Sequence, residues 1–290
     1  MTSNWDDLRT VLALVRHRTL ARAGDVLGLN YTTVARRITR AEAALGTVLF
    51  DRLADGYVPT EAGLAVARNA ERMEEAEFAL TREVAARDET LTGRLVITAP
   101  QLLIGGYLAP VMAQFSQAHP EVELVVRATN ELLDLARREA DLAIRISRDP
   151  GDDLMGVRLA AQETASFAAP DLAKAIAADA TMRLPWVGFT TMAAPPKASL
   201  VSHPNAYVRM QFDDMVAVIG AARAGLGVAR LPLFIGRSES GLMQVPVLPP
   251  QPYADVWLVG HRDVWRSAKP RAFRNVLVPY FRSRRADFVT

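Results

Sequence analysis

The chain has 290 residues, 50% of them hydrophobic, and its 34 basic and 32 acidic residues leave a formal net charge of +2. A chain of this length and apolar content can bury more than one core, so we expect two domains rather than one. It has no cysteine and four scattered histidines, which excludes disulfides and thiol nucleophiles and argues against a metal site.

The sequence lacks the signals of a membrane or exported protein. It contains no run of about 18 or more apolar residues. Its first residues, "MTSNWDDLRT", have neither the basic region nor the apolar core of an export signal. We therefore expect a soluble, cytoplasmic protein with no membrane partner.

The first part of the chain predicts three short helices. The first, "NWDDLRTVLALVRHRT", turns Leu8, Val11, Leu12 and Val15 inward. The second, "LARAGDVLG", follows Thr19 as its cap and ends at Gly28, which can adopt the left-handed conformation. Asn30 caps the third, and Leu29 and Val34 are placed to staple the chain entry. Two short helices joined so tightly are typical of a helix-turn-helix, whose second helix normally enters the major groove.

The third predicted helix has one apolar stripe, formed by Val34, Ile38, Ala41 and Leu45. On a helical wheel, Thr32, Arg36 and Thr39 point away from this stripe, flanked by Thr33 and Arg40. Arginine and threonine match base edges and phosphates and do not neutralise one another, although such arginines can also be merely solvated. We predict that Thr32, Thr33 and Arg36 read base edges. Contacts to phosphate or the minor groove are assigned to Tyr31, Arg37, Arg40 and Arg52.

A hairpin and a long helix follow. The segment "GTVLFDRLADGYVPTEAG" has two apolar runs around an Asp-Gly turn, which indicates a hairpin or wing with Arg52 at its start. A single helix is predicted from Thr60 to Glu89. Its apolar stripe consists of Val66, Ala70, Met73, Ala76, Leu80 and Val84. The simplest partner for this stripe is the same helix of another subunit, and the alternative is packing on the next domain.

After a hinge at "LTGR", residues 91–94, strands alternate with helices. The predicted order is "LVIT" strand, helix to about Ala118, "VELVVR" strand, "NELLDLARRE" helix and "ADLAIRI" strand, which favours a parallel sheet covered on both faces. A second series begins near Gln162, and the final helix, "KPRAFRNVLVPYFRSRR", can pack back on the first subdomain. Two α/β lobes around a cleft are typical of small-molecule binding. "GLGV", at 225–228, lacks a phosphate-binding pattern, so no dinucleotide or other cofactor is expected.

In this order and spacing, several fragments resemble the LysR-type transcriptional regulators. They are "LARAGDVLGLNYTTVARRITRAEAALGTVLFDR", "PTEAG", "GRLVITAP", "DLAIRI" and "AGLGVARLP". The resemblance implies an α/β protein with an N-terminal winged helix-turn-helix, a long linker helix and a two-lobed, periplasmic-binding-protein-like effector domain. It also implies linker-helix dimers that commonly pair into tetramers, and a small effector that alters the DNA complex. The family usually has Ser-Gln-Ser where this chain has Asn30 to Thr32, and often a serine where Ala99 stands.

These expectations define domains and a cleft. The DNA-binding domain is assigned to residues 1–60, the linker to 61–90 and the effector domain to 91–290, with lobe I about 91–161 and 266–290 and lobe II about 162–265. The predicted cleft residues are Pro100, Gln101, Thr129, Asn130, Arg145, Phe189 and Thr190. Because an arginine near helix N-termini favours an anion, we expect a small organic acid with an aromatic or aliphatic body. Arg145 could equally be a surface arginine, and Gln101 a helix cap.

Two other classes of protein compete with this interpretation. An enzyme on the same two-lobed fold would use Arg145 as an anion clamp and His203 or an acid as base, but no catalytic pair supports it and the first 90 residues would be idle. An exported solute-binding protein would need a signal sequence. We therefore expect a regulator that is not an enzyme, with double-stranded DNA, a small effector and copies of itself as partners.

Overall fold

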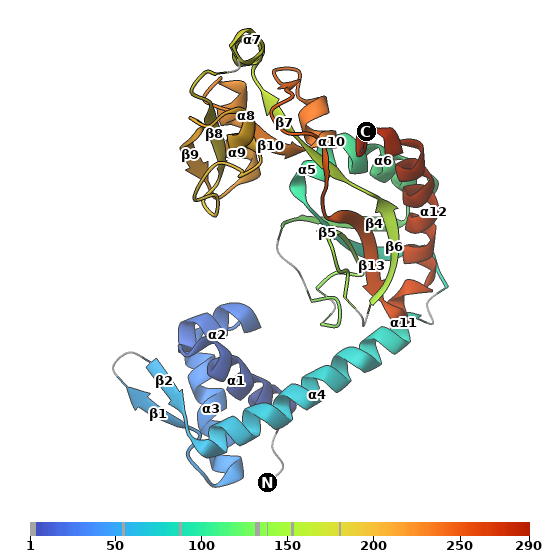
Figure 1. Ribbon diagram of the computed structural model, residues 1–290. Coiled ribbons are helices and arrows are strands. Elements are labelled where there is room, and N and C mark those ends of the chain that lie inside the picture. The colour runs from blue at the N-terminus through green and yellow to red at the C-terminus, as the bar shows by residue number, and fades with distance from the viewer. Residues whose placement is uncertain are drawn as a thin grey trace. The chain divides into compact units, whose positions relative to one another are not determined.

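The computed structural model describes residues 4–53, 56–86, 89–130, 134–137, 139–151, 154–179 and 181–290. The chain separates into two compact units, Met1–Val84 and Ala85–Thr290 (Figure 1). Each unit has its own buried apolar cluster.

The N-terminal unit is a small helical domain with a hairpin. Its elements are α1 (Trp5–His17), α2 (Leu20–Leu27), α3 (Tyr31–Leu45), β1 (Phe50–Leu53), β2 (Gly56–Pro59) and α4 (Glu61–Ala86). The side chains of Asn4, Thr19 and Asn30 cap α1, α2 and α3 by accepting backbone N–H bonds, which is why the helices begin there. The core includes Val34 and Ile38 of the predicted stripe. Leu45, predicted to be buried with them, is 41% exposed because it lies in the last turn of α3.

The hairpin is antiparallel, as predicted for a wing. Asp55 of the predicted Asp-Gly turn lies outside the described residues. Gly56 has φ 146°, and a Cβ there would lie 2.8 Å from the carbonyl oxygen of Arg18. The next amide, of Tyr57, donates to that same carbonyl at 3.0 Å. Glycine therefore lets β2 lie directly against the end of α1.

The long helix α4 uses one face inside this unit. Ala67 and Ala70 are buried against Leu12 of α1. Arg16 of α1 adds ion pairs of 2.8 Å to both Glu71 and Glu74. The predicted apolar stripe is therefore divided: Val66 and Ala70 pack within the unit, whereas Met73, Ala76, Leu80 and Val84 are exposed. The helix ends at Ala86, and Glu89, its predicted last residue, is not helical.

In the C-terminal unit, one lobe is built on a five-stranded sheet of order β4-β3-β5-β13-β6. The strands are β3 (Gly93–Ala99), β4 (Val122–Ala128), β5 (Leu142–Ser147), β6 (Leu154–Ala160) and β13 (Asp255–His261). The helices are α5 (Gln101–Leu103), the π-helix η1 (Ile104–Leu108), α6 (Ala109–Ala118), α11 (Arg262–Trp265), α12 (Ala268–Ser283) and the 3-10 helix η2 (Arg285–Asp287). We call these elements lobe I. In Figure 1, α12 runs alongside β6.

Lobe II contains two smaller sheets. In one, β7 (Glu163–Ala168) pairs antiparallel with β10 (Ala229–Pro232), β11 (Met243–Gln244) and β12 (Gln251–Pro252). In the other, β8 (Pro185–Phe189) runs parallel to β9 (Tyr207–Phe212). The helices are α7 (Pro170–Ala178), α8 (Ser199–Ser202), α9 (Met215–Arg223) and α10 (Leu233–Ser238).

The structure corrects three expectations for this unit. The sheet of lobe I is mixed, because β3 runs parallel to β4 and β5 while β13 is antiparallel to β5 and β6. Strand β13 lies within the predicted span of lobe II, 162–265, yet it pairs with strands of lobe I. The chain therefore returns to lobe I before Asp255, earlier than predicted. The predicted helix at 130–139 lies partly outside the described residues, and its described residues 135–137 form a turn.

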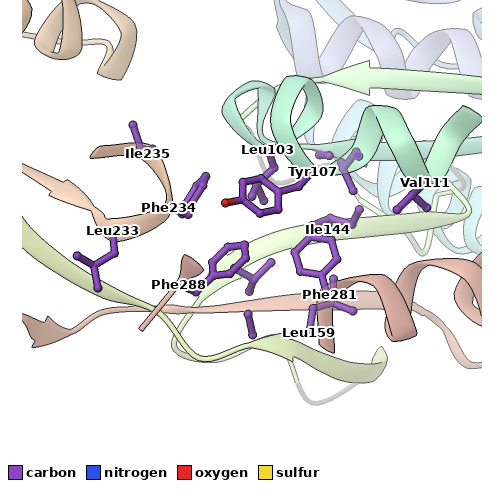
Figure 2. Packing of buried hydrophobic residues seen from close by; sticks show 14 of the residues in the cluster. Leu103, Tyr107, Val111, Ile144, Leu159, Leu233, Phe234, Ile235, Phe281 and Phe288 are labelled. Carbon is purple, nitrogen blue, oxygen red and sulfur yellow. The ribbon is translucent and has the colours of Figure 1, made fainter. Parts of the chain in front are cut away.

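Aromatic side chains join the two lobes (Figure 2). Tyr107 of η1 packs edge-on against Phe234 of α10, with ring centroids 5.5 Å apart. Phe288, near the C-terminus, stacks on Phe234 at 5.0 Å and lies 4.9 Å from the Tyr107 ring. Because α10 belongs to lobe II and η1 to lobe I, this cluster is a shared core.

Candidate DNA-binding surface and ligand cavity

The turn between α2 and α3 is fixed by short contacts. Gly28 ends α2 in the left-handed conformation, with φ 66°. The amide of Leu29 donates to the carbonyl of Gly24 at 2.8 Å, and the Asn30 side chain accepts from the Thr33 amide at 2.8 Å. A Cβ on Gly24 would lie 2.5 Å from the Leu29 carbonyl oxygen, so only glycine allows this approach. The turn therefore holds α3 at one angle to α2.

The outward face of α3 carries the residues predicted to read bases. Tyr31 is 63% exposed, Thr32 and Arg36 are exposed, and Thr33 is half-buried. The Thr32 hydroxyl donates to the Asn30 side chain at 2.6 Å. Arg36 makes no hydrogen bond or ion pair with any other residue that the structure describes. Its guanidinium is thus available to an outside acceptor.

Arg37 and Arg40, predicted to contact phosphate, already have partners on α1. Arg40 binds the carboxylate of Asp7 through two N–H groups, one of them at 2.8 Å, and Asp7 is only 4% exposed. This carboxylate raises the pKa of Arg40. Arg37 pairs with Asp6 at 3.1 Å. Both arginines therefore fasten α3 to the start of α1, a role that helical spacing within α3 does not reveal.

Arg52 lies on the hairpin, apart from α3 in the sequence. It is exposed on β1, and its guanidinium carbon lies 6.0 Å from the ring centre of Tyr57, its partner across the strands. The tyrosine ring supports the long arginine side chain without neutralising it. A cation on the wing is thus available beside the helical domain.

A cavity of about 370 Å³ lies in the C-terminal unit, lined by residues of both lobes. Five of the seven predicted cleft residues line it: Pro100, Thr129, Asn130, Arg145 and Phe189. The remaining two predicted residues, Gln101 and Thr190, do not line it. Gln101 is exposed at the start of α5, and the Thr190 amide donates to the Phe212 carbonyl at 2.9 Å. Arg145 lies within β5 rather than after it, because β5 extends beyond its pairing with β3.

Several residues of the cavity wall were not predicted. They include Thr98, Asp213, Asp214, Met215, Phe234 and Tyr253. The two aspartates follow β9 directly, so the rule that selected loops after parallel strands in lobe I would also have found them. Phe234 and Tyr253 follow antiparallel strands and carry no such signal.

The charges of the cavity differ in their surroundings. Burial lowers the pKa of Arg145, and the carboxylate of Asp134 opposes that shift. Asp214 caps α9, accepting the amides of Val216 at 2.7 Å and Ala217 at 3.2 Å. His203, the base considered for an enzyme, is buried at the end of α8 and is not part of the cavity wall.

Two negative findings apply to the described ranges. No group of three or more histidine, aspartate or glutamate side chains there is arranged to hold a metal ion. Among the helices of these ranges, none combines the length and the apolar character that crossing a membrane requires.

Two family models match this chain. The model of the bacterial regulatory helix-turn-helix protein, lysR family, matches residues 5–64, and that of the LysR substrate binding domain matches residues 88–282. The Mau operon transcriptional activator of Paracoccus denitrificans is 37% identical over 145 residues, 50% of this chain and 51% of that protein. The transcriptional activator AmpR of Rhodobacter capsulatus is 26% identical over 274 residues, 91% of this chain and 90% of that protein.

Solved structures support the same architecture. The full-length structure of the Vibrio cholerae virulence activator AphB, described as a member of the LTTR family, matches with a TM-score of 0.59 at 19% identity. The match covers 96% of this chain and 99% of that one. At this identity the likeness shows the fold alone.

Proposed function

The chain belongs to the LysR family of DNA-binding transcriptional regulators, which are not enzymes, and from this premise we propose that α3 enters the major groove of double-stranded DNA. Thr32, Thr33 and Arg36 would contact base edges. Tyr31, Arg37, Arg40 and Arg52 would hold phosphates or the minor groove. A protein with this partner would act in the cytoplasm.

One observation carries the proposal. Arg36 is exposed on the face of α3 opposite the buried Val34 and Ile38, and it makes no ion pair with the described residues. A surface arginine without a neutralising acid keeps all its donors for guanine or phosphate. The rigid α2–α3 turn supports a fixed presentation of this side chain.

The test needs a matched DNA site. Mapping of bound fragments on the genome of the source organism supplies one, and gel-shift titrations then compare it with a scrambled version. Arg36→Ala should weaken binding to the matched site by about 1 to 3 kcal/mol and relax sequence preference. Arg158→Ala, a surface change in lobe I, is the control. Unchanged affinity and preference in Arg36→Ala would contradict the role of this helix.

We also propose a homodimer through α4, able to pair into a tetramer. Met73, Leu80 and Val84 are exposed at spacings of seven and four, the pattern of a helix–helix seam. The adjacent surface near the start of α4 is already covered, since Ala67 and Ala70 pack against α1. A second copy of the same helix is the simplest cover for the free stripe.

For the cavity we propose a small organic acid as effector. Arg145 would bind the carboxylate, and Leu103 and Phe189 would contact the apolar body. A ligand that binds only the folded state stabilises it by about 2.7 kcal/mol at a hundred times its dissociation constant. Thermal-shift measurements of small carboxylates against wild type and Arg145→Ala test this. Equal stabilisation of both proteins would exclude Arg145 as the clamp.

A further inference from the structure

The two walls of the cavity carry opposite charges. In lobe I, β3, β4 and β5 run parallel and bring Arg145 to the cavity. In lobe II, β8 and β9 run parallel, and Phe189 at the end of β8 is paired in register with Phe212 at the end of β9. Asp213 is the next residue, and it also lines the cavity. A cation from the sheet of lobe I therefore shares the cavity with a carboxylate that follows a strand of lobe II.

The two aspartates of lobe II are not equivalent. Asp214 accepts two amides at the start of α9, so its charge is balanced by the positive end of that helix. Asp213 is exposed and makes no hydrogen bond or ion pair within the described part of the chain. Its oxygens remain available to a donor in the cavity. The helix cap accounts for Asp214 and leaves Asp213 without a structural role.

Apolar and aromatic groups also line this cavity. Phe189 and Met215 do so in lobe II, and Phe234 and Tyr253 lie near the junction of the lobes. Aromatic faces attract cations as well as apolar groups. A purely anionic ligand on Arg145 would bring a second negative charge into the cavity that Asp213 lines. An ammonium group on the ligand replaces this repulsion with a charge-assisted hydrogen bond.

We propose that the effector is a zwitterion of the amino-acid type, with its carboxylate on Arg145, its ammonium on Asp213 and an apolar body against the aromatic wall. The inference rests on the proposed acid site and adds a second recognition point to it. It narrows the ligand class from organic acids to those that also carry an amine.

Two matched series of probes test the inference by calorimetry and thermal shift on the full-length protein. The first is L-phenylalanine, 3-phenylpropanoate and 2-phenylethylamine, and the second is L-leucine, 4-methylpentanoate and 3-methylbutylamine. In at least one series the amino acid should bind at least about tenfold more tightly than the acid or the amine. Asp213→Asn should weaken binding of the amino acid by about tenfold to a hundredfold. Binding of the acid should not weaken, and should tighten as the repulsion by Asp213 is removed. Asp171→Asn removes an exposed carboxylate of α7 outside the cavity and is the matched control.

The outcomes separate this inference from the acid site. If the acids bind as tightly as their amino acids and Asp213→Asn has no effect, the zwitterion is excluded and the acid site stands. If only the amines bind, or if no probe of either series binds, both proposals fail. If Asp171→Asn weakens binding of the amino acid as much as Asp213→Asn does, the loss comes from the change in net charge. That result would contradict the proposed contact between Asp213 and the ammonium group.

Discussion

Arg36 and Arg40 lie one turn apart on α3, but their surroundings differ. Arg36 has no acidic partner among the described residues, whereas Arg40 is held by the buried carboxylate of Asp7. A buried carboxylate that loses its partner keeps its desolvation cost without compensation. The side chain of Arg40 is still 54% exposed, so pairing with Asp7 leaves room for a phosphate contact.

We therefore predict different effects of the two alanine substitutions on stability. Arg40→Ala should lower the melting temperature of the N-terminal unit, because Asp7 then remains buried and unpaired. Arg36→Ala should leave that temperature unchanged, because Arg36 makes no hydrogen bond or ion pair with the described residues. Differential scanning calorimetry of both variants checks this. Equal melting temperatures for Arg40→Ala and wild type would show that the ion pair contributes nothing to folding.

A second residue-scale prediction concerns Tyr107. Burial, with the nearby Asp287 carboxylate, raises its pKa to about 12. The folded state thus favours the neutral phenol, so its contribution to stability is complete below the unfolded pKa of about 10 and is lost as the pH rises toward 12. After solvent screening we expect a loss of about 1 to 2 kcal/mol over this range.

Urea unfolding of the C-terminal unit from pH 9 to 12 measures that loss. Tyr107→Phe has no ionisable group and should lose less stability over the same interval, although it gives up the 3.2 Å bond to Asp287 at every pH. If both proteins lose stability at the same rate, ionisation of Tyr107 is not linked to unfolding.

At the scale of elements, α4 serves two surfaces. Its exposed stripe of Met73, Leu80 and Val84 is the proposed dimer seam. Leu80→Glu should place a charge in that seam and shift the protein to monomer at micromolar concentration, as measured by light scattering. Leu64→Glu is the control, because Leu64 is also exposed but lies about 160° away around the helix. A wild-type monomer, or equal dissociation by both variants, would contradict the seam.

Local signals predicted the elements better than their partners. As expected, α2 begins after Thr19 and ends at Gly28, and α3 begins after Asn30. These ends were predictable because capping depends on residues within one turn. The antiparallel pairing of β13 with β5 was missed, since an apolar run does not specify which distant strand it joins. The contact between Arg40 and Asp7 was missed for the same reason, because it depends on how two helices pack.

In the cavity the same distinction applies. Pro100 and Thr129 were found because parallel strands bring their carboxyl ends to one edge, a rule that depends on local order. Tyr253 reaches the wall where the chain crosses from β12 in lobe II to β13 in lobe I, and Phe234 reaches it because α10 packs against lobe I. Sequence periodicity carries no information on that crossing.

At the scale of the whole C-terminal unit, the last residues of the chain tie lobe I to lobe II. Phe288 is fully buried against Phe234 of α10, which also lines the cavity (Figure 2). Arg237 of α10 donates to two carbonyls of this segment, at 2.8 and 3.0 Å. Glu163 of β7 accepts from the Thr290 amide at 2.9 Å, and its own amide donates to the Phe288 carbonyl at 2.9 Å. The last residues of the chain therefore support the junction between the two lobes, on the side of Phe234 that faces away from the cavity.

This arrangement predicts that a single aromatic side chain outside the cavity affects both folding and binding. Phe288→Ala should destabilise the C-terminal unit by about 3 to 5 kcal/mol, the usual cost of emptying a buried phenylalanine site. It should also weaken effector binding, because Phe234 loses its stacking partner and can move away from the ligand. Phe288→Leu keeps much of the apolar volume and should cost less. Calorimetric unfolding, with titration of whichever acid or amino acid binds the wild type, measures both effects. If Phe288→Ala lowers stability but binds the probe as tightly as wild type, the C-terminal segment contributes to the core alone and does not support the cavity wall.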